Sequence, residues 1–212
     1  VVAVEHRDRS ACWTYTLEKD AEGNYQEKPI IMRQLEPDEK EFKLRNPQLH
    51  KRVSECVKAL HLMEEMNLGQ CGSAEQKLRG SKIILGQDFD WTQFKGRLDI
   101  SRAAVAGHSF GGATAIASTA ISNDFQAAVV LDGWMMPIEW DLYAKAQQPL
   151  LFINAGVWQW TDNVKRMLKF DKLVAERLMV TFRNVVHQSF TDFTYPCKGF
   201  VGKKMGFQGE TE

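Results

Sequence analysis

The stretch AAVAGHSFGGAT, residues 103–114, places a serine two residues from a glycine on each side. The short apolar run 103–106 precedes this G-x-S-x-G motif, and Gly112 and several small residues follow it. This order predicts a strand, a sharp turn and a helix, the arrangement known as a nucleophile elbow. The turn exposes the Ser109 hydroxyl, and the start of the helix favours an oxyanion there. The stretch therefore predicts an α/β fold with Ser109 as nucleophile, the alternative being a glycine-rich turn with a structural serine.

Residues beside the serine are expected to support it. Gly107 and Gly111 are expected to be required, because a Cβ at either position would collide with the neighbouring strand or helix. Hydrolases with this turn take one oxyanion donor from the residue after the nucleophile, which is Phe110 here. The second donor comes from a loop nearer the N-terminus, and no HGGG-like segment supplies it in this chain.

A serine hydroxyl needs a base within hydrogen-bond reach, and the base needs an acid to orient it. In folds with this elbow the chain order is serine, acid, histidine. The chain has five histidines, of which one follows the serine: His6, His50, His61, His108 and His187. His187 is therefore the predicted base, whereas we expect His108, inside the turn, to pack or to form a local hydrogen bond.

The acid is chosen by its position in the predicted sheet. Seven carboxylates lie between Ser109 and His187: Asp124, Asp132, Glu139, Asp141, Asp162, Asp171 and Glu176. Asp132 directly follows the apolar run 127–131, which is typical of a buried parallel strand. Catalytic groups of open α/β sheets gather at the carboxyl ends of strands. Asp132 is therefore the predicted acid. Asp162 is the second choice, although its sequence context predicts a helix N-cap.

These residues carry a resemblance to a known family. GHSFGGAT, LDGWMMP and VVHQSFTDF, with EHRDRSA and EFKLRNPQLHKRVSEC nearer the N-terminus, resemble the platelet-activating-factor acetylhydrolases, and the last stretch resembles their intracellular branch. The resemblance implies the α/β-hydrolase fold, a mostly parallel sheet flanked by helices. It also implies a calcium-independent serine phospholipase A2 that uses no cofactor or metal. The triad of that family falls on Ser109, Asp132 and His187.

The same resemblance suggests a substrate. It implies hydrolysis of the short sn-2 acetyl ester of platelet-activating factor and of related short-chain or oxidised phospholipids. Aromatic and methionine side chains follow Asp132, and apolar walls suit an acyl substrate, although such rings also pack protein cores. In the family, residues beside the acid line the acyl pocket, which makes Trp134 the expected pocket wall. Two alternatives stay open: a general carboxylesterase for soluble esters, and a non-catalytic fragment without a complete oxyanion hole.

A segment after His187 is expected to contact a lipid interface. Phe200, Val201 and Met205 are spaced with Lys203 and Lys204 between them, as in a short basic amphipathic surface. An ordinary surface helix is the alternative reading of this periodicity. In the family resembled, a membrane-contacting helix occupies this place. We therefore expect peripheral contact with a phospholipid surface.

Composition limits the remaining possibilities. The 27 basic and 27 acidic side chains balance, which argues against a nucleic-acid partner. Residues 103–123 lack formal charge, but their glycines and the turn at Ser109 argue against a transmembrane segment. Four widely spaced cysteines without a CxxC pattern, and no N-x-[ST] acceptor, favour a cytoplasmic location, and the expected lipid contact would make the protein membrane-associated there. The chain does not begin with methionine, so a secretory signal or a lipidation site stays open.

The remaining pattern predicts a single, incomplete α/β-hydrolase domain over residues 1–212, truncated at both ends. We expect a strand over residues 1–5, a charged excursion over 10–45, and an irregular insertion over 69–100. Asn46 and Pro47 predict the start of a helix with an apolar stripe. Further predicted elements are strands over 150–154 and 178–182 and a helix over 162–170.

Overall fold

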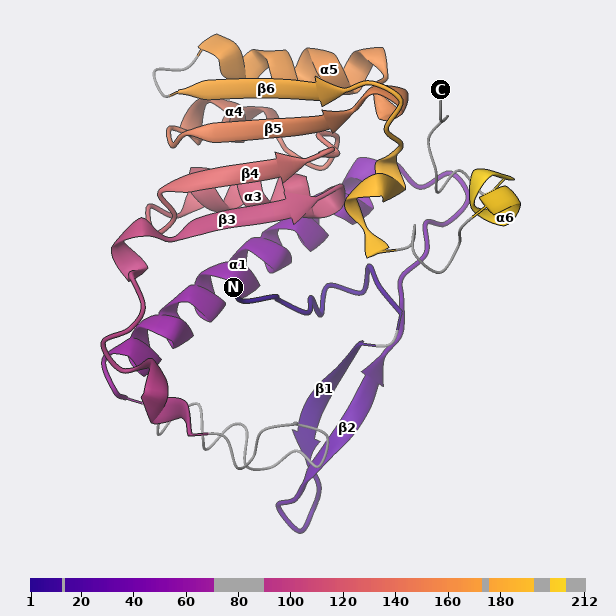
Figure 1. The fold of residues 1–212 in the computed structure, drawn as a ribbon. Coiled ribbons are helices and arrows are strands. Elements are labelled where there is room, and N and C mark those ends of the chain that lie inside the picture. Colours follow the sequence, from indigo (N-terminus) through magenta and orange to yellow (C-terminus); the bar gives the residue numbers. More distant parts are fainter. Residues whose placement is uncertain (13, 71–89, 173–175, 193–198, 205–212) are drawn as a thin grey trace. The chain divides into compact units, whose positions relative to one another are not determined.

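The computed structural model describes residues 1–12, 14–70, 90–172, 176–192 and 199–204. The chain divides into two compact units, Val1–Arg102 and Ala103–Glu212. Figure 1 shows the elements of both units. The expectation that residues 1–212 form one domain stays a prediction.

The first unit contains a hairpin, a long helix and two short 3₁₀ turns. β1 (Thr14–Lys19) pairs antiparallel with β2 (Tyr25–Ile30). Asp20 begins the turn between them, and its side chain accepts hydrogen bonds from the backbone N–H groups of Glu22 and Asn24. The helix is α1 (Glu41–Asn67), and the 3₁₀ turns span Trp91–Phe94 and Ile100–Arg102. The hairpin lies within the stretch that we expected to be a charged excursion.

Helix α1 begins six residues before the predicted start. Glu41 is its first residue and Pro47 lies inside it, so the prediction that Pro47 opens the helix is wrong. The buried stripe of α1 already begins at Leu44 and continues through Leu49 and Val53. Proline inside a helix costs about 3 kcal/mol or more, and burial of the whole stripe, at about 1.5–3 kcal/mol for each side chain such as Leu49, offsets that cost.

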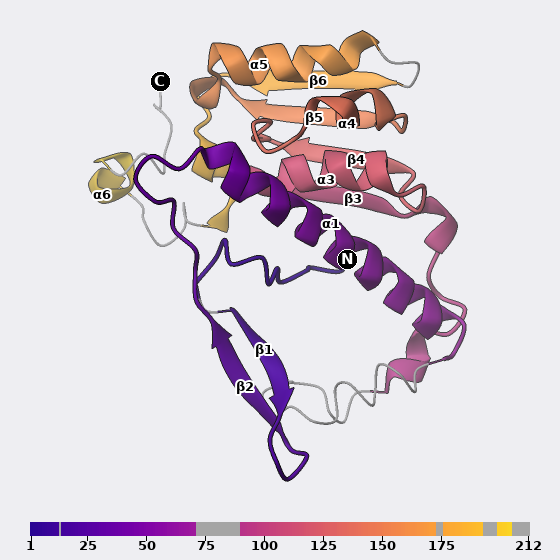
Figure 2. The same ribbon diagram turned by 180° about the vertical axis from the view of Figure 1, so that it is seen from behind.

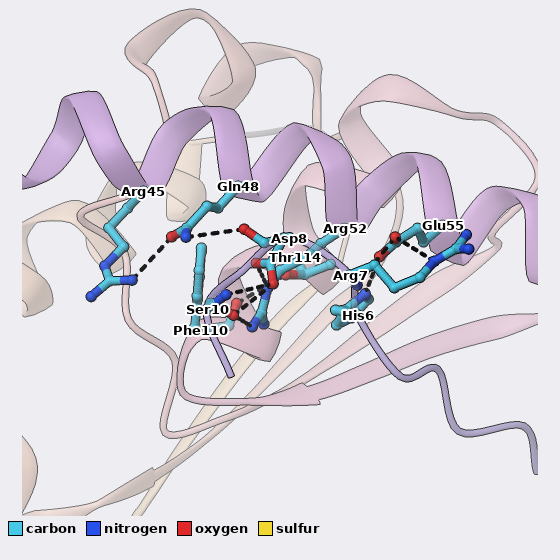
Figure 3. Close-up of polar contacts among 10 residues, drawn as sticks. All are labelled: His6, Arg7, Asp8, Ser10, Arg45, Gln48, Arg52, Glu55, Phe110 and Thr114. Carbon is cyan, nitrogen blue, oxygen red and sulfur yellow. Dashed lines mark hydrogen bonds and ion pairs between the residues drawn. The ribbon is translucent and has the colours of Figure 1, made fainter. Parts of the chain in front are cut away.

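Residues 5–10 of the N-terminal segment lie along α1, as the close-up in Figure 3 shows. The Asp8 side chain is fully buried and pairs with the Arg52 Nε at 2.6 Å. Ser10 donates its hydroxyl to Asp8 Oδ1 at 2.7 Å, and Gln48 Nε2 donates to the Asp8 carbonyl at 3.1 Å. Burial acts to raise the pKa of Asp8, but Arg52 and Ser10 outweigh it and the pKa is lowered. This network fixes the segment after Glu5.

The predicted strand over residues 1–5 is wrong. These residues pair with no strand among those that the structure describes, and Val1 and Val2 are exposed. Extended backbone forms a strand only where a neighbour completes its hydrogen bonds. An apolar run predicts side chains that suit a strand, but it does not show whether a neighbouring strand is present to pair with it.

The second unit is built on a parallel sheet of four strands in chain order. Its strands are β3 (Ala104–His108), β4 (Ala127–Leu131), β5 (Leu150–Ala155) and β6 (Arg177–Phe182). Each pairs in register with the next: His108 lies opposite Leu131, Leu131 opposite Ile153, and Ala155 opposite Phe182. The carboxyl ends of all four strands therefore lie at one edge of the sheet, as Figure 1 shows.

Three helices cover one face of this sheet: α3 (Phe110–Ile121), α4 (Trp140–Lys145) and α5 (Thr161–Met167). Figure 2 shows them in front of the strands. Crossovers between parallel strands are right-handed, so strands added in one direction place their helices on the same face. Ile116, Val130 and Phe152 are almost completely buried in this layer. A 3₁₀ stretch, Leu168–Lys172, extends α5 and includes the predicted end of that helix.

A last short helix, α6 (Gly199–Lys204), belongs to the same unit. Within the described part of the chain, no helix has both the length and the apolar character needed to cross a bilayer.

Candidate active site

Ser109 occupies a strained turn between β3 and α3. Its backbone angles are φ 57° and ψ −117°, a combination that costs a residue with a side chain on the order of 1–3 kcal/mol. The Ser109 N–H donates to the Leu131 carbonyl at 3.0 Å, and the Ser109 carbonyl accepts from Gly112 at 3.0 Å and from Trp134 at 2.9 Å. These bonds tie the turn to β4, to the loop after β4 and to the first turn of α3.

Glycines permit the close packing of this turn, but not all of those predicted. A Cβ at Gly107 would lie 2.0 Å from the Gly111 carbonyl oxygen, as expected from the sequence. A Cβ at Gly111 would meet nothing within 4 Å, so the steric reason predicted for Gly111 is wrong. Gly112 is tight instead, because a Cβ there would lie 2.8 Å from the Gly133 Cα. The residue that follows the motif therefore brings the helix close to the loop after β4.

Asp132 directly follows β4, and its side chain is fully buried. Its φ of 45° is a left-handed conformation that aspartate tolerates better than most residues. Oδ1 accepts hydrogen bonds from the Ala155 N–H at 2.8 Å and from Gln159 Nε2 at 3.1 Å. Oδ2 lies 2.7 Å from His187 Nδ1. The structure thus brings the predicted acid to the predicted base across two neighbouring strand ends.

His187 begins the 3₁₀ turn His187–Phe190 that follows β6. Because the carboxylate of Asp132 accepts at Nδ1, the neutral imidazole keeps its lone pair on Nε2. Within the described part of the chain, the ring makes this one hydrogen bond and the His187 carbonyl accepts another from His108; neither involves Ser109. Hydrogen bonds between nucleophile and base are often long before substrate binds.

His108 contacts the base rather than a near neighbour in sequence. Its Nε2 donates to the His187 carbonyl at 3.0 Å, and the two imidazole rings lie 4.3 Å apart between centroids. The pKa of His108 is lowered, first by burial and then by the charge of His187. A neutral His108 adds no positive charge beside the base.

Phe110 and Trp134, the predicted oxyanion donor and pocket wall, contact each other. Phe110 is the first residue of α3, where backbone N–H groups point out along the helix axis. Its ring meets the Trp134 ring edge-on, with 5.6 Å between centroids. Trp134 is half-buried, whereas the next residue, Met135, is fully buried. The two large apolar side chains that follow Gly133 therefore differ: Met135 belongs to the core, and Trp134 lies against Phe110 beside the serine turn.

Two amide side chains at this site were not predicted from the sequence. Gln159 contacts Asp132 as described above. Asn163 of α5 is buried, accepts from the Met135 N–H at 2.8 Å and donates to the Gly133 carbonyl at 2.9 Å. It therefore holds both sides of Trp134. The sequence signal that could have indicated them is their position soon after β5, the strand next to β4.

The alternative acid, Asp162, has another partner. Its Oδ2 accepts from Arg166 Nε at 3.0 Å within α5, and the Asp162 side chain is 68% exposed. The N-cap of α5 is Trp160, so the predicted capping role of Asp162 is wrong.

The structure does not describe the side chains of the three residues predicted to contact a membrane. Phe200 and Val201 lie in α6, but their side chains, and all of Met205, are outside the described residues. In the described part of the chain, no cluster of three histidine, cysteine or acidic side chains could hold a metal ion.

The four-stranded parallel sheet with its helices and serine-bearing turn has the fold of an α/β hydrolase. A ferulic acid esterase from Streptomyces cinnamoneus shares this fold over 92% of the chain and 49% of its own, with a TM-score of 0.54 and 18% identity. The sequence model of one family, platelet-activating factor acetylhydrolase, isoform II, matches residues 1–212. The chain belongs to this platelet-activating factor acetylhydrolase family.

Curated relatives agree with the family match. Platelet-activating factor acetylhydrolases of Gallus gallus and Canis lupus familiaris are 39% and 36% identical to the chain over its whole length. The chain covers 50% of the first relative and 46% of the second. It thus spans about half the length of the curated relatives that it matches.

Proposed function

We propose that this protein is a serine esterase that removes the short sn-2 acyl group, acetyl above all, from platelet-activating factor and from related short-chain or oxidised phospholipids. The observation that carries the proposal is the 2.7 Å contact between His187 Nδ1 and Asp132 Oδ2, at the sheet edge where Ser109 occupies its strained turn. Family membership supplies the substrate class.

In the proposed reaction, Ser109 Oγ attacks the acyl carbonyl while His187 Nε2 takes the serine proton. Asp132 holds the tautomer of His187 and stabilises the imidazolium, and the Phe110 N–H donates to the oxyanion. The imidazolium returns its proton to the departing glycerol oxygen, leaving an acyl-serine and a lysophospholipid. A water molecule, deprotonated by His187, then releases the carboxylic acid and restores Ser109.

Base, acid and oxyanion donor are all protein groups in this scheme. We therefore propose that hydrolysis is calcium-independent, so that EDTA leaves the rate unchanged. Trp134 forms part of the acyl pocket wall, supported by its contact with Phe110 and by the backbone bond from its N–H to Ser109.

We further propose that α6 and the residue after it touch the lipid surface through Phe200, Val201 and Met205. The lysines between them favour anionic headgroups. The double variant Phe200→Ser/Val201→Ser is expected to lose binding to sedimented phospholipid vesicles while it keeps hydrolysis of a water-soluble acetyl ester.

A fluorophosphonate probe tests the central proposal. The probe should label Ser109, identified by peptide mass spectrometry, and Ser109→Ala and His187→Ala should each abolish labelling. Loss of the nucleophile should lower kcat by a factor on the order of 10⁴–10⁶.

Ser118→Ala is the matched control, because Ser118 lies on α3, is fully buried and has no hydrogen-bond partner for its hydroxyl among the described residues. Labelled enzyme that cleaves only soluble esters would make the protein a general carboxylesterase. A folded chain without labelling would be a non-catalytic fragment of its family.

A further inference from the structure

The short segment Ala155–Trp160 contacts both the acid and the base of the proposed triad. Gln159 Nε2 donates to Asp132 Oδ1 at 3.1 Å. The Trp158 ring stacks on the His187 imidazole with centroids 3.7 Å apart and planes inclined by 23°. The turn after β5 therefore contacts both Asp132, which follows β4, and His187, which follows β6.

Trp158 is itself packed against a second tryptophan. The Trp160 ring meets it edge-on, with 4.6 Å between centroids and an interplanar angle of 89°. The His187 ring also packs on His108, 4.3 Å away between centroids. The imidazole is therefore held by two rings from different strand ends, in addition to its hydrogen bond to Asp132.

Stacking on an indole affects the base in two ways. It resists rotation of the imidazole away from Asp132, and its π face attracts the imidazolium that forms when His187 takes the serine proton. That positive charge develops as the proton is transferred, so the indole stabilises the transition state more than the complex with a neutral base. Stabilisation of this kind raises kcat and leaves KM almost unchanged.

Gln159 acts on the acid. Together with the Ala155 N–H it occupies Oδ1 of the Asp132 carboxylate, which leaves Oδ2 directed at His187. Without Gln159, Oδ1 would keep only the bond from the Ala155 N–H, and the His187 ring would carry more of the task of fixing the carboxylate rotation.

We propose that Trp158 and Gln159 are positioning residues of this site: the indole holds the His187 ring, and the amide holds the Asp132 carboxylate. The inference rests on the proposed esterase function. Each acts through a triad side chain, Trp158 through His187 and Gln159 through Asp132.

The first test is steady-state hydrolysis of a soluble acetyl ester by the full chain, with active sites counted by fluorophosphonate titration. Trp158→Leu should lower kcat per titrated site by about 10–100-fold with KM little changed, since small misplacements of catalytic groups cost this much. Gln159→Leu should lower kcat about 10-fold on the same grounds. Trp158→Phe, which keeps a stacking ring, should retain most of the rate. Trp140→Leu, at an exposed tryptophan on α4, is the control and should match the wild type.

The second test needs no activity. The His187 Nδ1 proton in its hydrogen bond to Asp132 should give a downfield proton NMR signal in the wild type. Trp158→Leu should broaden or remove this signal through exchange with water, and Trp158→Phe should keep it.

The outcomes separate the two proposals. A raised KM with unchanged kcat would make Trp158 a wall of the substrate pocket, and fewer titrated sites with unchanged kcat per site would make it purely structural. Either result, or an NMR signal unaffected by Trp158→Leu, overturns the positioning role. A wild type that hydrolyses no ester but shows the expected NMR changes would refute the esterase proposal and leave the positioning role standing.

Discussion

At the scale of single residues, Ser109 and its glycines show what local sequence can predict. The spacing of Gly107 and Ser109 predicted a strained turn, and the backbone angles of Ser109 have that strain. The structure contradicts the steric reason given for Gly111, because the direction of a Cβ depends on which side of the helix faces the neighbouring strand. That direction is a property of the packed sheet, which the motif does not contain.

This difference predicts unequal effects of two alanine substitutions. Gly107→Ala would put a Cβ 2.0 Å from a backbone oxygen and should destabilise the protein by about 3 kcal/mol or more. Gly111→Ala has open space in α3 and should be neutral or stabilising by up to about 1 kcal/mol. Urea unfolding monitored by circular dichroism measures both. Equal losses for the two variants would contradict the steric explanation.

At the scale of elements, strands with continuous apolar sequence could be predicted, whereas strands with polar sequence could not. The run 127–131 coincides with β4, and β3, β5 and β6 lie within two residues of their predicted ends. Buried parallel strands carry continuous apolar sequence, which is why they could be predicted. β1 and β2 are largely polar and exposed, so their sequence resembles that of a loop. The start of α1 was misplaced because proline is common at the first position of a helix, whereas here the buried stripe begins before Pro47, at Leu44.

The contact between the N-terminal segment and α1 leads to a prediction at this scale. Asp8 is fully buried and Arg52 is 13% exposed, so removing one partner leaves a buried charge. Asp8→Leu alone should destabilise the protein by about 3–5 kcal/mol, and Asp8→Leu/Arg52→Leu should recover at least half of that loss. Chemical denaturation of both variants measures the two free energies.

Glu18→Ala is the control, because its ion pair with Lys28 joins two exposed side chains, for which about 0–1 kcal/mol is expected. A double variant less stable than Asp8→Leu would show that the Arg52 stem, and not the charge pair, carries the contact.

At the scale of the whole molecule, the four strand ends explain why the triad residues could be proposed from chain order. Ser109, Asp132 and His187 each follow a strand of one sheet, and parallel strands end at one edge. Gln159 and Asn163 were missed because an amide side chain has no sequence pattern that marks its partner. His108 was placed in a local contact, and its carbonyl partner is 79 residues away, beyond the last strand. Such distant pairs depend on the register of the complete sheet.

His108 makes the second unit sensitive to pH. Burial and the charge of His187 lower its pKa below 6.5, and the hydrogen bond to the His187 carbonyl and the charge of Asp132 oppose this only in part. The unfolded chain therefore takes up this proton at a higher pH than the folded chain. The stability contributed by neutral His108 is complete above pH 6.5 and decreases as the pH falls toward its lowered value.

His108→Gln, which keeps an N–H donor for the His187 carbonyl, should lose less unfolding free energy than the wild type between pH 7.5 and pH 5.5, roughly the range in which histidine titrates. Parallel urea titrations at both pH values measure this difference. Identical pH dependence in the two proteins would mean that His108 titrates as it does in the unfolded chain.

The succession β3, β4, β5, β6 also sets the moment during synthesis at which the proposed enzyme becomes reactive. The bonds that hold Ser109 come from Leu131, Trp134 and Gly112, so the turn requires no residue of β5 or β6. His187 emerges only after β6, several seconds later at about 5–20 residues per second. In the proposed enzyme the serine turn is therefore translated before its base, and the nucleophile can become reactive only after β6 has brought His187 to Asp132.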